Sequence, residues 1–265
     1  MNRPKIVGII NITTDSFSDG EKFVESGAAI AQAKKLLKDG ADIVELSGVS
    51  SNPNSELVSA DVEIGRIEPV LEALDCVVSI DATKPEVQRF ALSKNVALIN
   101  DIRGFPDESI YGELAKSDAK LVIMHSTSSL DKAVRVPKTP QEVFDSIYSF
   151  FDSRVPKLIS AGISRERLII DPGMGFFLAE NPEPSLAVLA NLAKFKKHFG
   201  LPVMISVSRK SFLRNFAKGD VDVMARTLAA ELFAAHGGVD YIRTHDARAL
   251  NQALLTEGEI GRALG

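Results

Sequence analysis

The sequence of 265 residues contains no tryptophan and only one cysteine, Cys76. A single cysteine cannot form an internal disulfide, which is typical of proteins in a reducing compartment. We find no signal peptide and no apolar run of about 18 residues, the length that a membrane-spanning helix needs. These absences predict a soluble, cytoplasmic protein that does not enter a membrane.

Several familiar catalytic and binding motifs are absent as well. There is no H-E-x-x-H, C-x-x-C or G-x-S-x-G, so nothing indicates a zinc site or a serine hydrolase. The segment DPGMGFF (171–177) lacks the third glycine of a dinucleotide fingerprint, and SVSRKS (206–211) lacks the glycines of a P-loop. With 31 basic and 35 acidic residues, the net charge is −4, which gives no attraction to nucleic acid.

What the sequence does contain is an alternation of short apolar runs and helical patterns. Hydrophobic residues make up 45% of the chain, so a large core is possible. Eight strands that alternate with helices predict an α/β fold, a (β/α)8 TIM barrel, with residues 1–265 as a single domain. A doubly wound open sheet is the alternative that this pattern allows. The expected strands are 5–11, 42–48, 76–82, 96–101, 120–125, 167–173, 202–209 and 240–245.

The segments between the strands have helical periodicity. In 27–41, apolar residues recur at the spacings i, i+3, i+4 and i+7. Glycine commonly ends a helix because it adopts the left-handed conformation. We therefore expect C-terminal caps at the glycines that follow four helical patterns, namely Gly40, Gly162, Gly200 and Gly238.

Every expected strand ends in, or is followed directly by, polar or charged residues. In a barrel, the active site lies at the carboxyl ends of the strands. Side chains that follow apolar strands directly are also the ones that converge there. This end of the barrel is therefore the predicted active site, and it carries Asn11, Ser47, Asp81, Asn100, Asp101, Met124, His125, Asp171, Ser208, Arg209, Lys210, Arg243 and His245.

Three of these groups suit a flat, nitrogen-rich heterocycle. Asp81, Asn100 and Asp171 offer donors and acceptors, and a buried carboxylate can accept two parallel hydrogen bonds from a ring N–H and an exocyclic amine. The alternative is that Asp81 and Asp171 cap the helices that follow them. A hard cation such as Mg²⁺, bound by carboxylate or amide oxygens and phosphate, is compatible with the same residue types.

Positive charge gathers after the last two strands. Arg209, Lys210, Arg243 and His245 lie at the ends of strands seven and eight, where many barrels bind phosphate. The alternative is that they are solvated surface cations. That alternative is weaker here because all four come directly after apolar strands.

The segment IINITTDSFSDG (9–20) follows the first strand and contains Asn, Thr, Asp and Ser around one aromatic residue, Phe17. It is longer than an ordinary connection between a strand and a helix. Together with six further segments it resembles dihydropteroate synthase. The seven segments run in order along almost the whole chain, and they are NITTDSFSDG (11–20), SIDATKPEV (79–87), INDIRGF (99–105), LVIMHS (121–126), DPGMGF (171–176), SRKSF (208–212) and RTH (243–245).

The resemblance implies an activity and a set of roles. The family condenses p-aminobenzoate with 6-hydroxymethyl-7,8-dihydropterin pyrophosphate on a (β/α)8 barrel and uses Mg²⁺; its members are usually homodimers. By resemblance, the catalytic residues are Asp81, Asp171, Lys210, Arg243 and His245. Asp81, Asn100, Met124, Asp171 and Lys210 would contact the pterin. Asn11, Ser51, Asn52, Arg243 and His245 would contact pyrophosphate, with Asn11 also at the metal. Phe17, Pro53, Phe176, Phe177, Lys210 and Ser211 would surround p-aminobenzoate.

Two segments depart from the usual family pattern. Ser50-Ser51-Asn52-Pro53 stands where Ser-Thr-Arg-Pro is usual, so an arginine expected near pyrophosphate is missing. Gly175-Phe176-Phe177-Leu178-Ala179 replaces Gly-Phe-Gly-Lys and makes its segment longer. Both features resemble the mobile, sulfonamide-insensitive subfamily. Our hypothesis is that segment 176–179 obstructs sulfonamides but admits the p-aminobenzoate carboxylate, and neutral loop drift is the alternative.

Two other functions remain open from the sequence. A pterin-binding methyltransferase barrel would share Asp81, Asn100 and Asp171, but it handles no pyrophosphate and has no use for the 11–20 loop or for SRKS. An inactive pterin-binding protein would not need Asn11, Lys210, Arg243 and His245 together.

Overall fold

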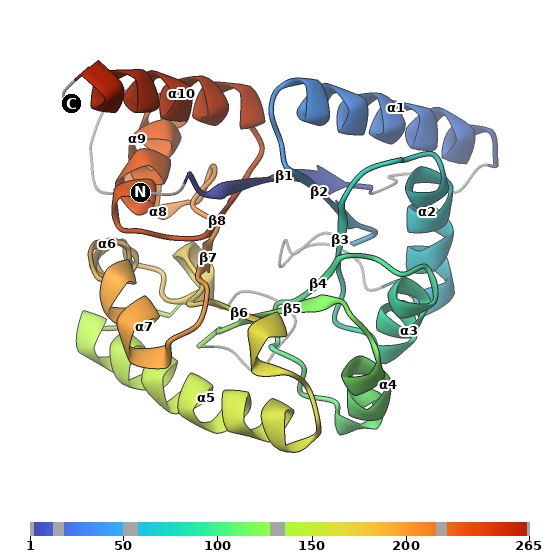
Figure 1. Ribbon diagram of the computed structural model, residues 1–265, viewed down its shortest axis with the longest axis horizontal. Helices are drawn as coiled ribbons and strands as arrows, with labels where there is room; N and C mark the ends of the chain where they lie inside the picture. The colour runs from blue at the N-terminus through green and yellow to red at the C-terminus, as the bar shows by residue number, and fades with distance from the viewer. Residues whose placement is uncertain (1–2, 13–18, 50–57, 128–135, 216–221, 264–265) are drawn as a thin grey trace.

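The computed structural model describes residues 3–12, 19–49, 58–127, 136–215 and 222–263. The strands form one eight-stranded parallel sheet in the order β6-β5-β4-β3-β2-β1-β8-β7. Because β1 pairs with both β2 and β8, the sheet curls into a ring with the helices outside it (Figure 1). The (β/α)8 prediction is confirmed, and the open-sheet alternative is wrong. The strands are β1 Lys5–Asn11, β2 Ile43–Ser47, β3 Val78–Asp81, β4 Leu98–Asp101, β5 Lys120–Met124, β6 Leu168–Asp171, β7 Met204–Ile205 and β8 Tyr241–Thr244.

The seventh strand is much shorter than the predicted 202–209. Pro202 has no N–H to donate, and the chain turns away after Val207, where Lys210 N donates to Val207 O. The ring nevertheless closes between β6 and β7. Ile170 N donates to Pro202 O at 3.0 Å, and Ile170 and Val203 form an isolated parallel bridge.

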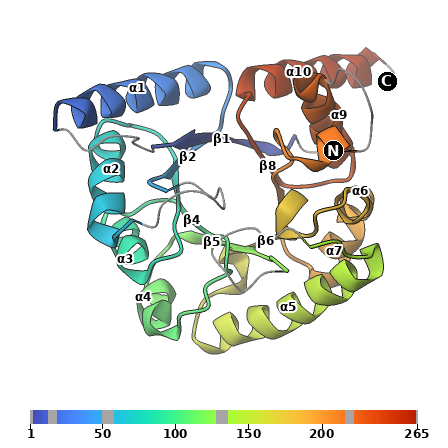
Figure 2. The same cartoon turned by 180° about the vertical axis from the view of Figure 1, so that it is seen from behind.

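The helices cover the outside of the ring on all sides (Figure 2). They are α1 Asp19–Lys38, α2 Ala60–Glu72, α3 Pro85–Ser93, α4 Tyr111–Lys116, α5 Pro140–Ser160, α6 Glu183–Ala190, α7 Leu192–Phe199, α8 Phe212–Asn215, α9 Val223–His236 and α10 Ala247–Ala263. The predicted glycine after α7 is confirmed as a left-handed cap, with Gly200 at φ 59° and its N–H bonded to Lys196 O. Within the described residues, no helix is both long and apolar enough to cross a membrane.

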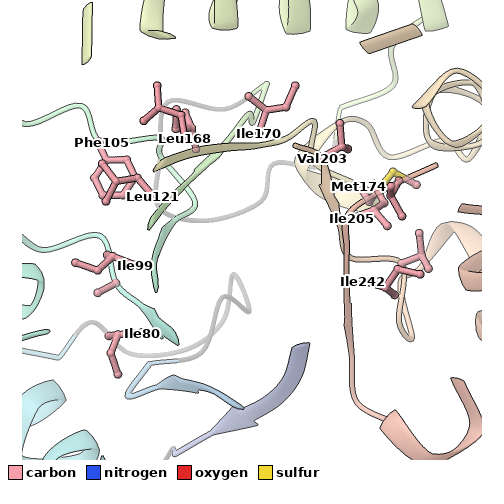
Figure 3. Close-up of a cluster of buried hydrophobic side chains, with 14 of the residues drawn as sticks. Ile80, Ile99, Phe105, Leu121, Leu168, Ile170, Met174, Val203, Ile205 and Ile242 are labelled. Atoms are coloured by element: carbon pink, nitrogen blue, oxygen red, sulfur yellow. The ribbon is translucent and has the colours of Figure 1, made fainter. Parts of the chain in front are cut away.

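Two apolar layers follow from the alternation of side chains along the strands. Outward-facing residues such as Ile80, Ile99 and Ile242 pack against the helices in the main core and lie on the outer side of the strand ring (Figure 3). The inward-facing residues form a separate cluster that fills the barrel near the amino ends of its strands. This inner layer consists of Val7, Ile43, Leu98, Val122, Ile169, Met204 and Tyr241.

Candidate active site at the carboxyl end of the barrel

The site residues occupy the next inward positions along the same strands. Two residues beyond the inner apolar layer, the period-two alternation brings polar side chains to the inside of the barrel. The strand register aligns them, because Asp81 pairs with Asn100 and Met124 with Asp171. We call the buried residues Glu45, Asn100 and Asp171, together with the largely buried Asp81 and Arg243, the polar ring.

Arg243 is the centre of the polar ring. Its Nη2 donates to Asp81 Oδ2 at 2.9 Å, and its Nε donates to Glu45 Oε1. The three side chains come from β8, β3 and β2, and the Arg243 side chain is only 16% exposed. Burial lowers the pKa of Arg243, but Glu45 and Asp81 outweigh that effect and leave it raised. The guanidinium therefore stays charged inside the barrel.

Asp81 and Asp171 are carboxyl groups whose proton affinity is increased. Burial raises the pKa of Asp81 to about 7, against the opposing effect of Arg243. Burial also raises the pKa of Asp171 to about 6, although Gly173 N donates to Asp171 Oδ1 at 2.8 Å. Desolvation disfavours a carboxylate, so a cationic or N–H-rich ligand would be the natural partner for these groups.

Neither aspartate caps a helix. The residue before α3 is Lys84, which makes no side-chain cap, and Asp171 closes a local turn through Gly173 instead. The capping alternative is therefore wrong for both residues. That turn is tight, since Gly173 has φ 78° and a Cβ there would lie 2.3 Å from His125 O.

Lys210 lies against the departing segment after β6. Its Nζ is 4.7 Å from the centroid of the Phe177 ring, and a Cβ on Gly175 would be 3.3 Å from its Cδ. Burial and the nearby Arg243 lower the pKa of Lys210 to about 8. Phe177 is buried, whereas Phe176 and Ser211 are partly exposed.

Segment 175–179 is fixed by hydrogen bonds. Gly175 N donates to Ser185 Oγ at 3.0 Å, and Thr127 N donates to Phe177 O at 2.9 Å. Leu178 is fully buried. The longer segment is thus packed into the protein beside Lys210 rather than held out into solvent.

His245 is half-buried beside Ser208. The Ser208 hydroxyl accepts a hydrogen bond from His245 N at 3.2 Å and lies 3.0 Å from Nδ1. Burial and the cations of Arg209, Arg243 and Lys210 lower the pKa of His245 to about 4. Its imidazole is neutral near pH 7, so it offers a hydrogen bond rather than the positive charge that the sequence suggested.

The remaining predicted residues differ in burial, and some of them lie outside the described part of the chain. Asn11 is exposed at the end of β1, in register with Ser47, and Met124 is buried at the end of β5. Four predicted residues lie outside the described part of the chain, namely Phe17, Ser51, Asn52 and Pro53.

Sequence reasoning missed Glu45. It lies two residues before the end of β2, and its side chain is fully buried. A partial signal was present, because Glu45 interrupts the apolar run DIVELSG (42–48) and shares its face of the strand with Ser47, while Val44 and Leu46 on the other face are apolar.

A family model described as "Pterin binding enzyme" matches residues 7–245. Dihydropteroate synthase type-2 from Escherichia coli is 53% identical over 96% of this chain and 95% of the relative. Dihydropteroate synthase type-3 from the same species is 49% identical, and the match covers 98% of this chain and 99% of that relative. The crystal structure of dihydropteroate synthase from Anaplasma phagocytophilum with bound 6-hydroxymethylpterin-monophosphate has a TM-score of 0.85 and 33% identity, and the match covers 98% of this chain and 100% of that one.

A barrel with this polar ring and this family match is a pterin-binding enzyme. With relatives this similar over their full length, the chain belongs to the dihydropteroate synthase family. It is a transferase of folate biosynthesis that condenses 6-hydroxymethyl-7,8-dihydropterin pyrophosphate with p-aminobenzoate.

Proposed function

We propose that Asp81, Asn100, Asp171 and Arg243 of the polar ring bind the dihydropterin pyrophosphate, with its pterin deep in the barrel and its pyrophosphate toward Arg243 and His245. The observation that carries this proposal is the Oδ1 atom of Asn100, which is buried and has no hydrogen-bond partner among the described residues. A buried acceptor without a donor is costly. A ring or exocyclic N–H of the substrate would satisfy it.

The pterin end of the site is formed by acids and one apolar side chain. Asp171 and Asn100 accept hydrogen bonds from the heterocycle, and Lys210 donates to it. Buried Met124 offers a polarisable face against the flat ring. Asp81 and Asp171 favour the positive charge that develops on the pterin as pyrophosphate leaves.

The pyrophosphate end is formed by groups on or after β8, after β7 and at the end of β1. Arg243 supplies a fixed positive charge, and His245 and Asn11 supply hydrogen-bonding atoms nearer to solvent. Arg209 and Lys210 lower the pKa of His245, which places their charge close to it. These residues bind and orient the leaving group, whose departing oxygens carry the charge that grows in the transition state.

We propose Mg²⁺ beside Asn11, whose amide oxygen at the exposed end of β1 is one ligand of the kind that Mg²⁺ accepts. The described residues contain no group of three or more His, Cys, Asp or Glu that could hold a metal ion. One amide oxygen suits the way Mg²⁺ is commonly bound, with most ligands from water and substrate phosphates. When bound there, Mg²⁺ would add positive charge against the leaving pyrophosphate.

The p-aminobenzoate end lies beside Lys210. The buried ring of Phe177 and the partly exposed Phe176 provide aromatic surface, and Lys210 and Ser211 are close enough to Gly175 to border the same space. The aryl amine is itself the nucleophile, so the chain needs no catalytic serine or cysteine. Its task is to hold the amine near the exocyclic methylene and to exclude water.

Sulfonamide insensitivity is the finer part of the proposal. The longer segment 175–179 is packed firmly between Thr127 and Ser185, which keeps the Phe177 ring next to Lys210. A sulfonyl group is tetrahedral and bulkier than a carboxylate. The fixed ring would therefore penalise a sulfonamide more than p-aminobenzoate.

Pyrophosphate release tests the activity directly. The protein is supplied with dihydropterin pyrophosphate and Mg²⁺, with and without p-aminobenzoate, and then with excess sulfamethoxazole. We expect release that requires p-aminobenzoate and survives the drug. Release abolished by the drug would overturn only the insensitivity, whereas absence of release would overturn the function.

The role of the Phe177 ring can be tested by F177A, and also by deletion of Phe177 and Leu178. We expect the inhibition constant for sulfamethoxazole, relative to KM for p-aminobenzoate, to fall about tenfold, a typical effect of one apolar contact. F144A on α5 serves as the matched control, because that ring packs against Phe195 instead. An unchanged ratio in F177A and in the deletion would favour neutral drift of the segment.

We also propose that the protein is cytoplasmic and forms a homodimer. On α9 and α10, Phe233 is 53% exposed, Leu255 50% and Ile260 57%. Burial of such side chains would stabilise a dimer. Light scattering of the purified protein measures its mass, and a monomer at micromolar concentration would contradict the proposal.

A further inference from the structure

Glu45 joins three strands inside the barrel. Its Oε1 accepts a hydrogen bond from Arg243 Nε on β8, and its Oε2 accepts from Ser79 Oγ at 3.0 Å and from Asn100 Nδ2 at 3.3 Å. None of its side chain is exposed. The carboxylate therefore contacts only protein groups and no solvent.

The contact with Asn100 fixes the direction of that amide. A carboxylate paired with a guanidinium only accepts hydrogen bonds, so Asn100 must turn its NH₂ group toward Glu45. Its carbonyl Oδ1 then points the other way. That atom is buried and lacks a donor among the described residues, so it is available to a ligand N–H.

The contact with Arg243 fixes the plane of its guanidinium. A guanidinium has five N–H groups in one rigid plane. One on Nε donates to Glu45 and one on Nη2 to Asp81, while the described residues provide no acceptor for the other three. These are the N–H groups left to bind an anion or a polar ligand edge.

We propose that Glu45 is a positioning residue for the dihydropterin pyrophosphate: it orients Asn100 as an acceptor and Arg243 as a donor toward the substrate. This inference rests on the proposed function, which puts the pterin against Asn100 and the leaving group near Arg243. Glu45 itself touches neither the substrate nor the reacting atoms.

Packing alone gives no reason for an acid at this position. The nearest inward residues below it, Ile43 and Val7, are apolar, and a buried carboxylate costs more free energy than an apolar side chain of similar size. The charge also acts on the rest of the polar ring. It raises the pKa of Asp81 and of Asp171, and it helps to keep Arg243 protonated.

The variant E45Q tests the proposal because it keeps the shape but puts an NH₂ group where two donors now converge. Asn100 could then reverse and present a donor to the pterin. We expect KM for dihydropterin pyrophosphate to rise, and kcat/KM to fall, about 10- to 100-fold, the effect of one hydrogen bond to a charged group. KM for p-aminobenzoate should stay within about twofold.

A double-mutant cycle separates positioning from simple loss of stability. In an N100A background, the effect of E45Q on KM should be at least about threefold smaller than in the wild type, because part of it acts through the missing amide. Inorganic pyrophosphate, used as a product inhibitor, should also bind E45Q more weakly if Arg243 is misaligned. If the KM effects of E45Q and N100A multiply in full in the double variant, the two residues act independently and the proposal is wrong. A loss in E45Q that is confined to kcat would also overturn it.

Controls keep the inference distinct from the proposed function. D240N removes a carboxylate that joins strands at the other end of the barrel, and it should leave both KM values unchanged. Absence of p-aminobenzoate-dependent release in the wild type would defeat the proposed function. An active wild type with an unchanged E45Q would defeat only the role of Glu45.

A second variant, E45D, serves if E45Q does not fold. It should show a smaller loss that is again selective for the pterin substrate. An equal loss for both substrates would contradict positioning.

Discussion

The two ends of the barrel use the same kinds of residue for different purposes. At the amino end, Asp42 accepts from Ile6 N at 2.7 Å and pairs with Arg3, and Asp240 accepts from Val203 N at 2.8 Å and pairs with Lys196. These side chains are about one-third exposed. Each of these two acids is satisfied by a backbone N–H and a partly exposed cation, an arrangement that favours stability.

At the carboxyl end, some polar groups have no hydrogen-bond partner among the described residues. Asp81, Asp171 and Lys210 all have shifted pKa values, and burial is the main cause in each case. Asn100 Oδ1 and three N–H groups of Arg243 lack partners among the described residues. An unpaired buried acceptor costs stability, and Asn100 Oδ1 lies within the polar ring, so a ligand N–H there would complete it.

The largest expected effect comes from exchanging arginine for lysine at each end. R243K keeps the charge but cannot donate to Glu45 and Asp81 in one plane while facing the substrate. We expect kcat/KM to fall about 10²- to 10³-fold, measured by pyrophosphate release, with Tm nearly unchanged. R3K, whose arginine pairs with Asp42, should keep full activity. Equal losses in both variants would remove the distinction between the ends.

The fold was predictable because the strand pattern is regular. All eight strands lie within their expected segments, and only β7 is much shorter, since Pro202 and the turn after Val207 limit its pairing. The site was predictable where a polar residue ends a strand, as at Asp81 and Asp171. Glu45 was missed because it lies inside an apolar run, and recognising it requires knowing which face of β2 points inward.

The electrostatic state of the site was not predictable from residue types. On sequence alone, His245 counts among the positive charges, yet burial and three nearby cations lower its pKa to about 4. From residue type alone, Lys210 would have the usual pKa of a lysine, but burial beside Arg243 lowers its pKa to about 8. Such shifts depend on distances between strands that are far apart in the chain.

The second prediction compares two glycines with the same backbone angle. Gly173 follows β6 at the carboxyl end and Gly238 precedes β8 at the amino end, and both have φ 78°. A Cβ at Gly173 would lie 2.3 Å from His125 O, whereas nothing lies within 4 Å of one at Gly238. We expect G173A to lose about 3 kcal/mol or more of unfolding free energy and G238A about 1 kcal/mol, by urea denaturation. Similar losses would show that steric contact with His125 is unimportant.

The third prediction is a bell-shaped pH profile of kcat/KM for dihydropterin pyrophosphate. As the pH falls through about 7 and about 6, Asp81 and Asp171 gain protons and lose their negative charge. As it rises through about 8, Lys210 loses its positive charge. The rate constant should decline on both sides, by up to about tenfold per pH unit for each essential group. R3K should retain the profile, and a flat response from pH 6 to 9 would contradict it.

The smallest expected effect is that of D240N at the amino end. Asp240 accepts hydrogen bonds from Val203 N and Lys196 Nζ, both at 2.8 Å, and an amide can accept only one of them while its NH₂ group faces the other donor. Because both side chains of the ion pair are about one-third or more exposed, we expect a loss of about 1 kcal/mol. That corresponds to about 2–4 °C in Tm by calorimetry. The pH profile and kcat/KM should not change, since no atom of this pair belongs to the polar ring. A marked loss of activity in D240N would mean that the two ends are coupled, and that stability and substrate binding cannot be assigned to separate ends of the barrel.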